Sequence, residues 1–236
     1  MKKFLYSFCL AVIILGAVGV VEAYVVTVGL PADKDVGNCF PFGCGYPGEY
    51  QQVYTSSQFD RPIMIEGLEF YNTQVNTGGP MNSGDFAISL STTSADWNTL
   101  SGTYSSNIGS DNTLVFNGSA FQPLTFGDTL VINLSTPFMY NPSNGNLLMD
   151  VIVTITDPNE YPPGSLGIFF DTNGLNNWGF NGNTIMGRVR YNAVDSGYGL
   201  VTGFVSAPVP EPSTMLLLGS GLLGLAGYGR KKLFKK

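Results

Sequence analysis

Apolar and polar residues alternate along several short stretches of the chain, with clusters of Gly, Asn, Asp and Pro between them. Residues 86–91, 130–134 and 147–155 each carry an apolar side chain at every second position, the period of a half-buried β-strand. The predicted inward side chains are Phe86, Ile88, Leu90, Leu130, Ile132, Leu134, Leu147, Met149, Val151, Val153 and Ile155, and Asp150 and Thr154 lie opposite. No long stretch has helical periodicity, so the pattern predicts an all-β protein.

Further apolar runs complete this picture. The additional predicted strands are Tyr24–Leu30, Glu49–Thr55, Ile63–Tyr71, Thr113–Asn117, Leu166–Asp171, Ile185–Tyr191 and Leu200–Val205. The Ile63–Tyr71 run changes phase near Gly67, which predicts a β-bulge. Ser94–Leu100 is expected to be the only helical turn, and residues 141–145 a tight turn. About ten such strands require two packed sheets, so we expect an antiparallel sandwich over residues 24–205, jelly-roll-like or alternatively immunoglobulin-like.

Two longer apolar segments bracket this body. Residues 1–23 combine Lys2 and Lys3, an apolar core and small residues before Tyr24, which predicts a cleaved signal peptide. Residues 206–212 form a Pro-rich linker, residues 213–229 are apolar, and residues 230–236 are basic. The apolar stretch predicts a membrane-spanning helix of roughly 25 Å, with Arg230, Lys231 and Lys232 as a cytoplasmic stop. The two ends together indicate an exported protein.

The C-terminal segment contains, in this order, an acidic residue between two prolines, a predicted apolar helix and a basic tail. Val209, Pro210, Glu211 and Pro212 should form an extended peptide, because each proline fixes its own φ and restricts the residue before it. This arrangement resembles the PEP-CTERM sorting signal. The resemblance implies processing by an exosortase-type membrane protease after C-terminal membrane anchoring, followed by attachment at the cell surface or release. A plain tail anchor is the alternative.

Charge and composition narrow the functions open to the body. Between the two end segments lie four basic and 15 acidic residues, a net charge of −11, which disfavours nucleic acid and anionic membranes as partners. The chain contains no histidine, which excludes Ser-His-Asp and Cys-His catalysis and His-ligated metals. Cys39 and Cys44 are expected to form a disulfide in an oxidising compartment.

No residue spacing in the body predicts a metal site or a cofactor. Asp33 and Asp35 resemble a calcium loop only in part, because the distal bidentate glutamate is missing. Calcium stays open as an alternative ligand if Asp150, Asp157, Glu160 and Asp171 converge. Paired carboxylates would suit a secreted polysaccharide hydrolase, but any two of 15 acidic residues could be such a pair.

Aromatic residues beside polar loops are the better indication of binding, because flat rings with neighbouring amides hold neutral sugars. These residues are Tyr46, Tyr50, Tyr54, Tyr161, Trp178, Phe180 and Tyr198. The segment with Asn177, Trp178, Phe180 and Asn181 is the predicted glycan-binding site; a hairpin whose Trp packs on the sandwich rim is the alternative.

The body also resembles a group of exported PEP-CTERM proteins without an assigned activity, over residues 84–97 and 136–151. This resemblance implies an extracellular β-domain and supplies no catalytic residues. We therefore expect a non-catalytic surface or matrix protein that binds glycan or exopolysaccharide. Its processing partners would be signal peptidase and the exosortase-type protease. A hydrolase and a purely structural biofilm scaffold are the alternatives.

Overall fold

The computed structural model describes residues 24–29, 37–45, 47–73, 81–82, 84–119, 124–154, 168–176, 179–180 and 184–206 of the chain. All of them belong to one compact unit, Tyr24–Ala207. Every regular element in these ranges is a β-strand or a single 3-10 turn, so the predicted all-β class is confirmed. The same ranges contain no helix of the length and apolar character that a membrane span requires. The predicted signal peptide, linker, membrane helix and basic tail lie outside the described residues, except Ser206.

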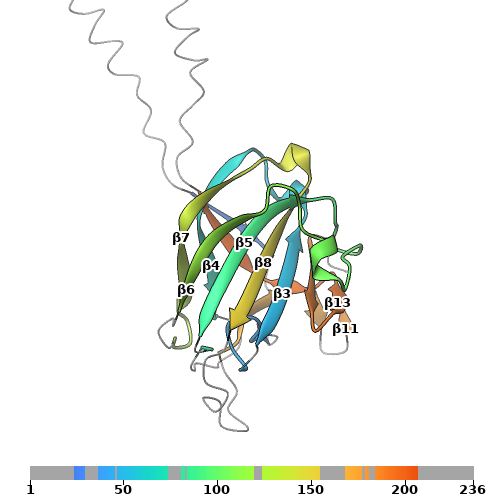
Figure 1. The fold of residues 1–236 in the computed structure, drawn as a ribbon. Helices are drawn as coiled ribbons and strands as arrows, with labels where there is room; N and C mark the ends of the chain where they lie inside the picture. The colour runs from blue at the N-terminus through green and yellow to red at the C-terminus, as the bar shows by residue number, and fades with distance from the viewer. Residues whose placement is uncertain are drawn as a thin grey trace, which may run out of the picture. The chain divides into compact units, whose positions relative to one another are not determined.

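Two antiparallel sheets form the sandwich. The four-stranded sheet has the order β1 (Tyr24–Val28), β15 (Thr202–Ser206), β4 (Ile63–Tyr71) and β7 (Thr129–Tyr140). The six-stranded sheet has the order β13 (Ala193–Ser196), β12 (Met186–Arg190), β3 (Gly48–Tyr54), β8 (Asn146–Thr154), β5 (Asp85–Thr93) and β6 (Thr113–Ser119). In Figure 1, β6, β5, β8 and β3 run side by side across the near face, and β4 lies behind them.

Two smaller sheets complete the described strands. One has the order β14 (Gly199–Leu200), β9 (Phe170–Asn173) and β2 (Gly37–Asn38). The other is the hairpin of β10 (Leu175–Asn176) and β11 (Gly179–Phe180).

The core between the sheets is built from the alternating side chains that the sequence pattern predicts. Phe86, Ile88 and Leu90 of β5 are fully buried, as are Leu147, Met149 and Val151 of β8. Leu130, Ile132 and Val153 are buried as expected, whereas Leu134 is half-buried. The bulge near Gly67 is confirmed by a register shift between Ile65 and Gly67 in the pairing of β4 with β7.

A disulfide joins Cys39 to Cys44, the pairing expected from the sequence. The short ring that it closes places Phe42 in the core, where its side chain is fully buried. The Phe42 ring centroid lies 4.7 Å from that of Phe70 and 5.7 Å from that of Phe86. The disulfide therefore fastens a loop whose aromatic side chain contacts both sheets.

The outer face of the six-stranded sheet is covered by residues 94–112, which we call the covering loop. Leu100 of this loop packs with Val53, Leu148 and Val189, which point away from the main core. Asp150 lies on this same outer face, as the alternation predicts, but it is buried, because the loop and its neighbours shield it from solvent. A second, smaller apolar cluster thus lies outside the sandwich.

The expectation of one helical turn at Ser94–Leu100 was wrong. Asp96 and Thr99 close a single hydrogen-bonded turn there, with Thr99 N donating to Asp96 O and Asp96 N donating to Thr99 Oγ1. Local side-chain bonds of this kind compete with helix continuation. The 3-10 turns of the described residues lie at Ser56–Gln58, Tyr104–Ser106 and Pro142–Asn144. The last of them confirms the turn predicted at residues 141–145.

Candidate functional site

Most of the site residues predicted from the sequence fall outside the described residues. These are Asn177, Trp178, Asn181, Val209, Pro210, Glu211, Pro212, Arg230, Lys231 and Lys232. For Phe180 only the backbone is described, and it pairs with Leu175 in the β10–β11 hairpin. The glycan-binding segment therefore stays a prediction from sequence.

Three aromatic residues expected near loops are instead part of the interior. Tyr50 and Tyr54 are fully buried and Tyr198 is nearly so. Tyr50 and Tyr54 are on the inner face of β3, since they alternate with Gln51 and Val53 of the outer face. Their hydroxyl groups are satisfied internally: Tyr50 donates to Gln52 Oε1 at 2.6 Å, and Tyr54 Oη lies 2.8 Å from Thr202 Oγ1. These rings hold the sandwich together and cannot contact a ligand.

The acidic residues considered for calcium do not converge where they are described. Asp150 lies on β8 beside Glu49, whereas Asp171 on β9 accepts hydrogen bonds from the backbone N–H and hydroxyl of Thr73. Asp157 and Glu160 lie outside the described residues. The described ranges hold no group of three or more acidic or cysteine side chains placed to bind a metal.

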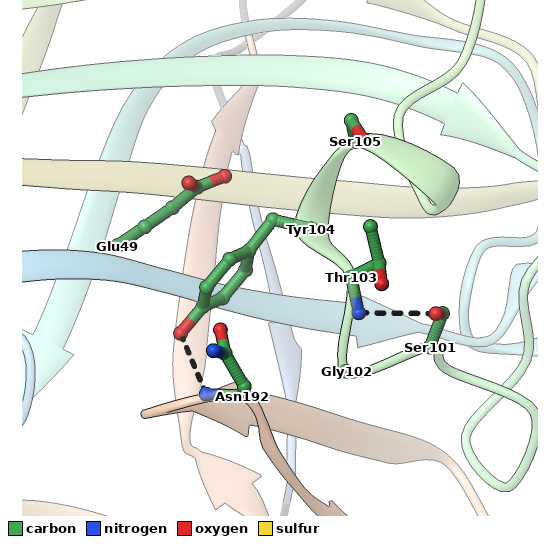
Figure 2. A pocket seen from close by; sticks show the side chains of 7 residues that line it. All are labelled: Glu49, Ser101, Gly102, Thr103, Tyr104, Ser105 and Asn192. Atoms are coloured by element: carbon green, nitrogen blue, oxygen red, sulfur yellow. Dashed lines mark hydrogen bonds between the residues drawn. The ribbon is translucent and has the colours of Figure 1, made fainter.

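A depression of about 500 Å³ lies where the covering loop meets the six-stranded sheet. Its lining residues are Glu49, Ser101, Gly102, Thr103, Tyr104, Ser105 and Asn192. They come from the start of β3, from the covering loop and from the turn between β12 and β13 (Figure 2). The depression thus combines one carboxyl group, three hydroxyl side chains, one amide and one aromatic ring.

Tyr104 joins two walls of the depression. Its half-buried ring packs on the outer apolar cluster, and its hydroxyl accepts a hydrogen bond from the backbone N–H of Asn192 at 3.3 Å (Figure 2). Asn192 has φ +60°, a left-handed conformation that asparagine tolerates better than most residues. The asparagine at position 192 therefore favours the turn conformation in which its backbone N–H reaches the Tyr104 hydroxyl.

Close backbone approaches hold the covering loop on the sheet. A Cβ atom on Gly102 would come within 2.4 Å of the carbonyl oxygen of Asn192. A Cβ atom on Gly187 of β12 would come within 2.2 Å of the carbonyl oxygen of Trp97. Only glycine fits at both positions, which explains how an irregular loop lies flat against the strands.

Gln51 links the covering loop to the acidic part of the site. Its Nε2 donates to the carbonyl oxygen of Tyr104 at 3.2 Å and to Glu49 Oε1 at 3.4 Å. Its Oε1 accepts from Nδ2 of Asn107 at 2.9 Å. Asn107 in turn binds both the N–H and the carbonyl of Ser101, so the wall of the depression is tied to β3 through buried amides.

Glu49 and Asp150 form a hydrogen-bonded carboxyl pair beside this amide network. Burial, reinforced by the charge of Glu49, raises the pKa of Asp150 to about 7. Burial also raises the pKa of Glu49, although its hydrogen bond with Asp150 opposes the rise. Since two adjacent carboxylates repel each other, the charge of Glu49 favours the protonated form of Asp150.

The separation of this pair bears on the hydrolase alternative. Glycosidases place their two carboxyl groups roughly 5 to 9.5 Å apart, which leaves room for the sugar or for a water molecule between them. Carboxyl groups that hydrogen-bond directly are closer than that. Hydrogen-bonded directly to each other, Glu49 and Asp150 are therefore closer together than a glycosidase pair.

The sequence patterns did not single out this depression. Glu49 and Asp150 meet only through the pairing of β3 with β8, where Glu49 is opposite Ile152 and Gln51 is opposite Asp150. Tyr104 lies in a Ser-, Gly- and Asn-rich stretch, which is the one signal that resembles the aromatic loops considered for glycan binding.

Comparison with known proteins identifies the C-terminal segment. Residues 208–231 match the PEP-CTERM protein-sorting motif. No curated protein matches the chain. A structure of infectious bursal disease virus, Gx strain, aligns with 88% of this chain and 51% of the viral chain, at 13% identity and a TM-score of 0.22. The chain thus spans about half the length of that protein.

The motif covers both the proline-flanked acid and the apolar and basic residues that follow it. It implies export, membrane anchoring through the C-terminus before processing, and processing by exosortase-type machinery. The chain carries a PEP-CTERM sorting motif at its C-terminal end, and its described body is an antiparallel β-sandwich.

Proposed function

We propose that this protein is a non-catalytic component of the cell surface or the extracellular matrix that binds glycan. The depression between the covering loop and the β12–β13 turn is the observation that carries this proposal. It is lined by the kinds of group that sugars require: hydroxyl and amide side chains beside an aromatic ring. Export by the PEP-CTERM route would bring such a surface into contact with extracellular polysaccharide.

The chemistry of the depression favours a polyhydroxylated ligand. Ser101, Thr103 and Ser105 supply hydroxyl groups that both donate and accept, and the Asn192 side chain supplies an amide. The side chains of Thr103, Ser105 and Asn192 are exposed, so a ligand can reach them without displacing the apolar cluster beneath. No large conformational change is needed for contact.

The segment with Trp178 is a second candidate surface. Its aromatic and amide composition motivates it, and its contribution can be separated from that of the depression by mutation. Binding through both surfaces would give multivalent contacts with one polysaccharide, which raises avidity without tight individual sites.

The test measures binding of the processed protein to a glycan array and to exopolysaccharide from the producing cells. Asn192→Gly removes the amide while keeping a residue that accepts positive φ, and Trp178→Ala removes the predicted ring. Val131→Ala, at an exposed position of β7 in the other sheet, is the matched control. We expect Asn192→Gly to weaken binding several-fold and Val131→Ala to leave it unchanged.

Other results would redirect the proposal. Loss of binding only with Trp178→Ala would assign the function to that segment instead of the depression. Absence of binding by the native protein in both assays would remove glycan recognition and favour a structural scaffold, especially if the protein self-assembles. Turnover of any polysaccharide that disappears when an acidic residue is changed to its amide would establish the hydrolase alternative.

A further inference from the structure

The turn between β12 and β13 carries an exposed aromatic ring on a strained backbone. Tyr191 has φ +50°, a left-handed conformation that is uncommon for a residue with a bulky side chain. Glycine, asparagine or aspartate usually occupies such turn positions. Burial compensates little of this cost, since 60% of Tyr191 is exposed. Because strained residues cluster where ligands bind, the ring is a candidate for contact with a ligand.

Phe40 and Arg190 lie beside this ring, and we call the three residues the turn cluster. The ring centroids of Phe40 and Tyr191 are 6.0 Å apart in an edge-to-face arrangement. The guanidinium carbon of Arg190 lies 5.0 Å from the Phe40 centroid and 5.9 Å from that of Tyr191. Asn38 fixes the backbone of Phe40 through two hydrogen bonds, at 2.8 Å and 3.3 Å. The next residue after the cluster, Asn192, lines the depression.

Arg190 has a surplus of positive charge and of hydrogen-bond donors around it. It shares one carboxylate with Arg188: Asp195 Oδ2 lies 2.8 Å from Nε of Arg188 and 3.7 Å from Nε of Arg190. Only the shorter distance is a hydrogen bond. Nε of Arg190 and Nη1 of Arg188 are both buried without a hydrogen-bond partner. Among the described residues, no other carboxylate pairs with either guanidinium, so two positive charges face one negative charge.

The free end of the Arg190 side chain is accessible. The side chain is 32% exposed, and Nε is its one nitrogen that is buried without a partner. Neither terminal amino group donates a hydrogen bond to a described residue, so both are open to solvent. Together they form a planar fork that matches the two oxygens of a carboxylate. The flanking rings shield the guanidinium in part, which strengthens its attraction to an anion.

We propose that the turn cluster binds an acidic sugar, a uronic acid, whose carboxylate contacts Arg190 while its ring packs on Tyr191. This inference rests on the proposed glycan-binding function and names the ligand class. The C–H face of a sugar packs on an aromatic ring, and the carboxylate accepts two hydrogen bonds from the guanidinium. Because the cluster and the depression flank the same turn, successive sugars of one chain can occupy both.

The charge of the body decides how this site must be tested. Its net charge of −11 repels a long polyanion at a distance. At roughly 0.15 M salt, charges more than about 8 Å apart are largely screened, whereas a carboxylate in contact with Arg190 is screened much less. Short oligomers at physiological salt therefore isolate the local contact.

Two oligosaccharides of equal length provide the test: a short oligogalacturonide and the same oligomer with its carboxylates converted to methyl esters. Titration calorimetry with the processed protein, at physiological salt and without divalent cations, measures both affinities. We expect the free acid to bind about 5- to 10-fold more tightly, because only the acid makes charge-assisted hydrogen bonds. Acetate, which offers the carboxylate without the sugar, should compete only weakly.

Arg190→Gln and Arg61→Gln are the matched variants, since each removes one positive charge. Arg61 is exposed and its guanidinium contacts Tyr24, outside the turn cluster. Arg190→Gln should abolish the preference for the free acid, and Arg61→Gln should keep it. Arg190→Lys retains the charge without the planar fork and should keep only part of the preference. Near-ultraviolet circular dichroism checks that each variant remains folded.

Tyr191→Asn tests the ring separately. Asparagine tolerates positive φ, so this variant should be at least as stable as the native protein. Loss of the ring should weaken binding of the acid and of the ester by a similar factor, several-fold, and leave their ratio unchanged. If both oligomers bind this variant as tightly as the native protein, the turn cluster is not the site.

Equal affinity of the native protein for the acid and the ester would overturn the ligand class and leave glycan binding standing. An equal loss of preference in Arg190→Gln and Arg61→Gln would also overturn it, because the preference would then reflect net charge alone. Competition by acetate as strong as that by the oligomer would reduce the site to one for simple anions. Failure to bind the oligogalacturonide alone would reject the acidic sugar, whereas failure on the whole glycan array would reject the proposed function as well.

Discussion

Asp150 has a carboxyl group that is almost wholly buried, with 6% of the residue exposed. Burial and the neighbouring charge of Glu49 raise the pKa of Asp150 to about 7, from an ordinary value of 3.8. Between these two values the folded protein retains a proton that the unfolded chain has lost. The contribution of Asp150 to the free energy of unfolding therefore falls as the pH rises from about 4 to 7 and stays low above that range.

Asp150→Asn should remove most of this pH dependence. The amide keeps the shape of the side chain and cannot ionise, so the variant should be more stable than the native protein at pH 8, by on the order of 2 to 4 kcal/mol. The two proteins should have similar stability at pH 4.5. Urea unfolding followed by fluorescence at both pH values measures the difference. If the two stability curves run parallel between pH 4.5 and 8, the assignment of the raised pKa to Asp150 is wrong.

The sequence could predict on which face of the sheet Asp150 lies, but it could not predict that this residue is buried. Alternation along β8 correctly placed Asp150 opposite Leu147 and Met149, yet alternation cannot tell whether that opposite face is open to solvent. The covering loop buries it, and the course of that loop depends on close backbone contacts such as that of Gly187 with Trp97. Such contacts connect segments far apart in the sequence and leave no periodic pattern.

At the level of strands, β12 and β13 are joined by a buried ion pair. Arg188 and Asp195 are cross-strand partners, and Arg188 Nε lies 2.8 Å from Asp195 Oδ2. The guanidinium carbon of Arg188 also lies 4.1 Å from the ring centroid of Tyr198. Arg188 is 5% exposed, so its charge depends on these partners for compensation.

Asp195→Asn should destabilise the sandwich by about 3 kcal/mol, because it leaves a buried guanidinium without its counter-charge. Arg188→Met combined with Asp195→Asn should cost less than the two single changes added together, since the double variant no longer leaves the buried Arg188 guanidinium without its counter-charge. Asp60→Asn, at an exposed carboxylate, is the matched control and should leave stability unchanged. Thermal and urea unfolding of the native protein, the two single variants and the double variant give the double-mutant cycle. If the losses of stability of the two single variants add up to that of the double variant, the role assigned to the ion pair is wrong.

Strands in which the apolar alternation runs over many residues could be predicted from the sequence, whereas strands too short to show it were missed. The bounds expected for β4 are those observed, and β5 and β8 match closely. The strands β2, β13 and β14 were missed, since each has only two to four residues and no periodic signal. The continuation of β7 to Tyr140 was also missed, because Pro137 interrupts the pattern. That proline is tolerated because β7 is the edge strand of its sheet.

For the molecule as a whole, the pairing of β1 with β15 has a topological consequence. Tyr24 is opposite Ser206, so the two ends of the described body lie side by side at one edge of the four-stranded sheet. The depression lies on the other sheet, near the start of β3. Ser206, at the end of β15, pairs with Ile65 of β4 near the opposite end of the body. The surface proposed to bind glycan is therefore remote from the strand that leads into the sorting motif.

Replacement of Pro210, Glu211 and Pro212 by alanine should stop processing while the body still folds. The two prolines hold an extended peptide, and removing them lets the preceding linker join the apolar helix, which hides the cleavage region from the protease. Full-length protein should then accumulate in the membrane fraction and disappear from the cell surface and medium, as immunoblots of fractionated cells would show. Pro208→Ala, at the first residue of the matched segment and outside the Pro210-Glu211-Pro212 sequence, is the control and should be processed normally. Unchanged size and distribution of the triple variant would mean that the motif does not direct sorting. Resistance of Cys39 and Cys44 to alkylation without prior reduction would show that their disulfide has formed in the retained protein.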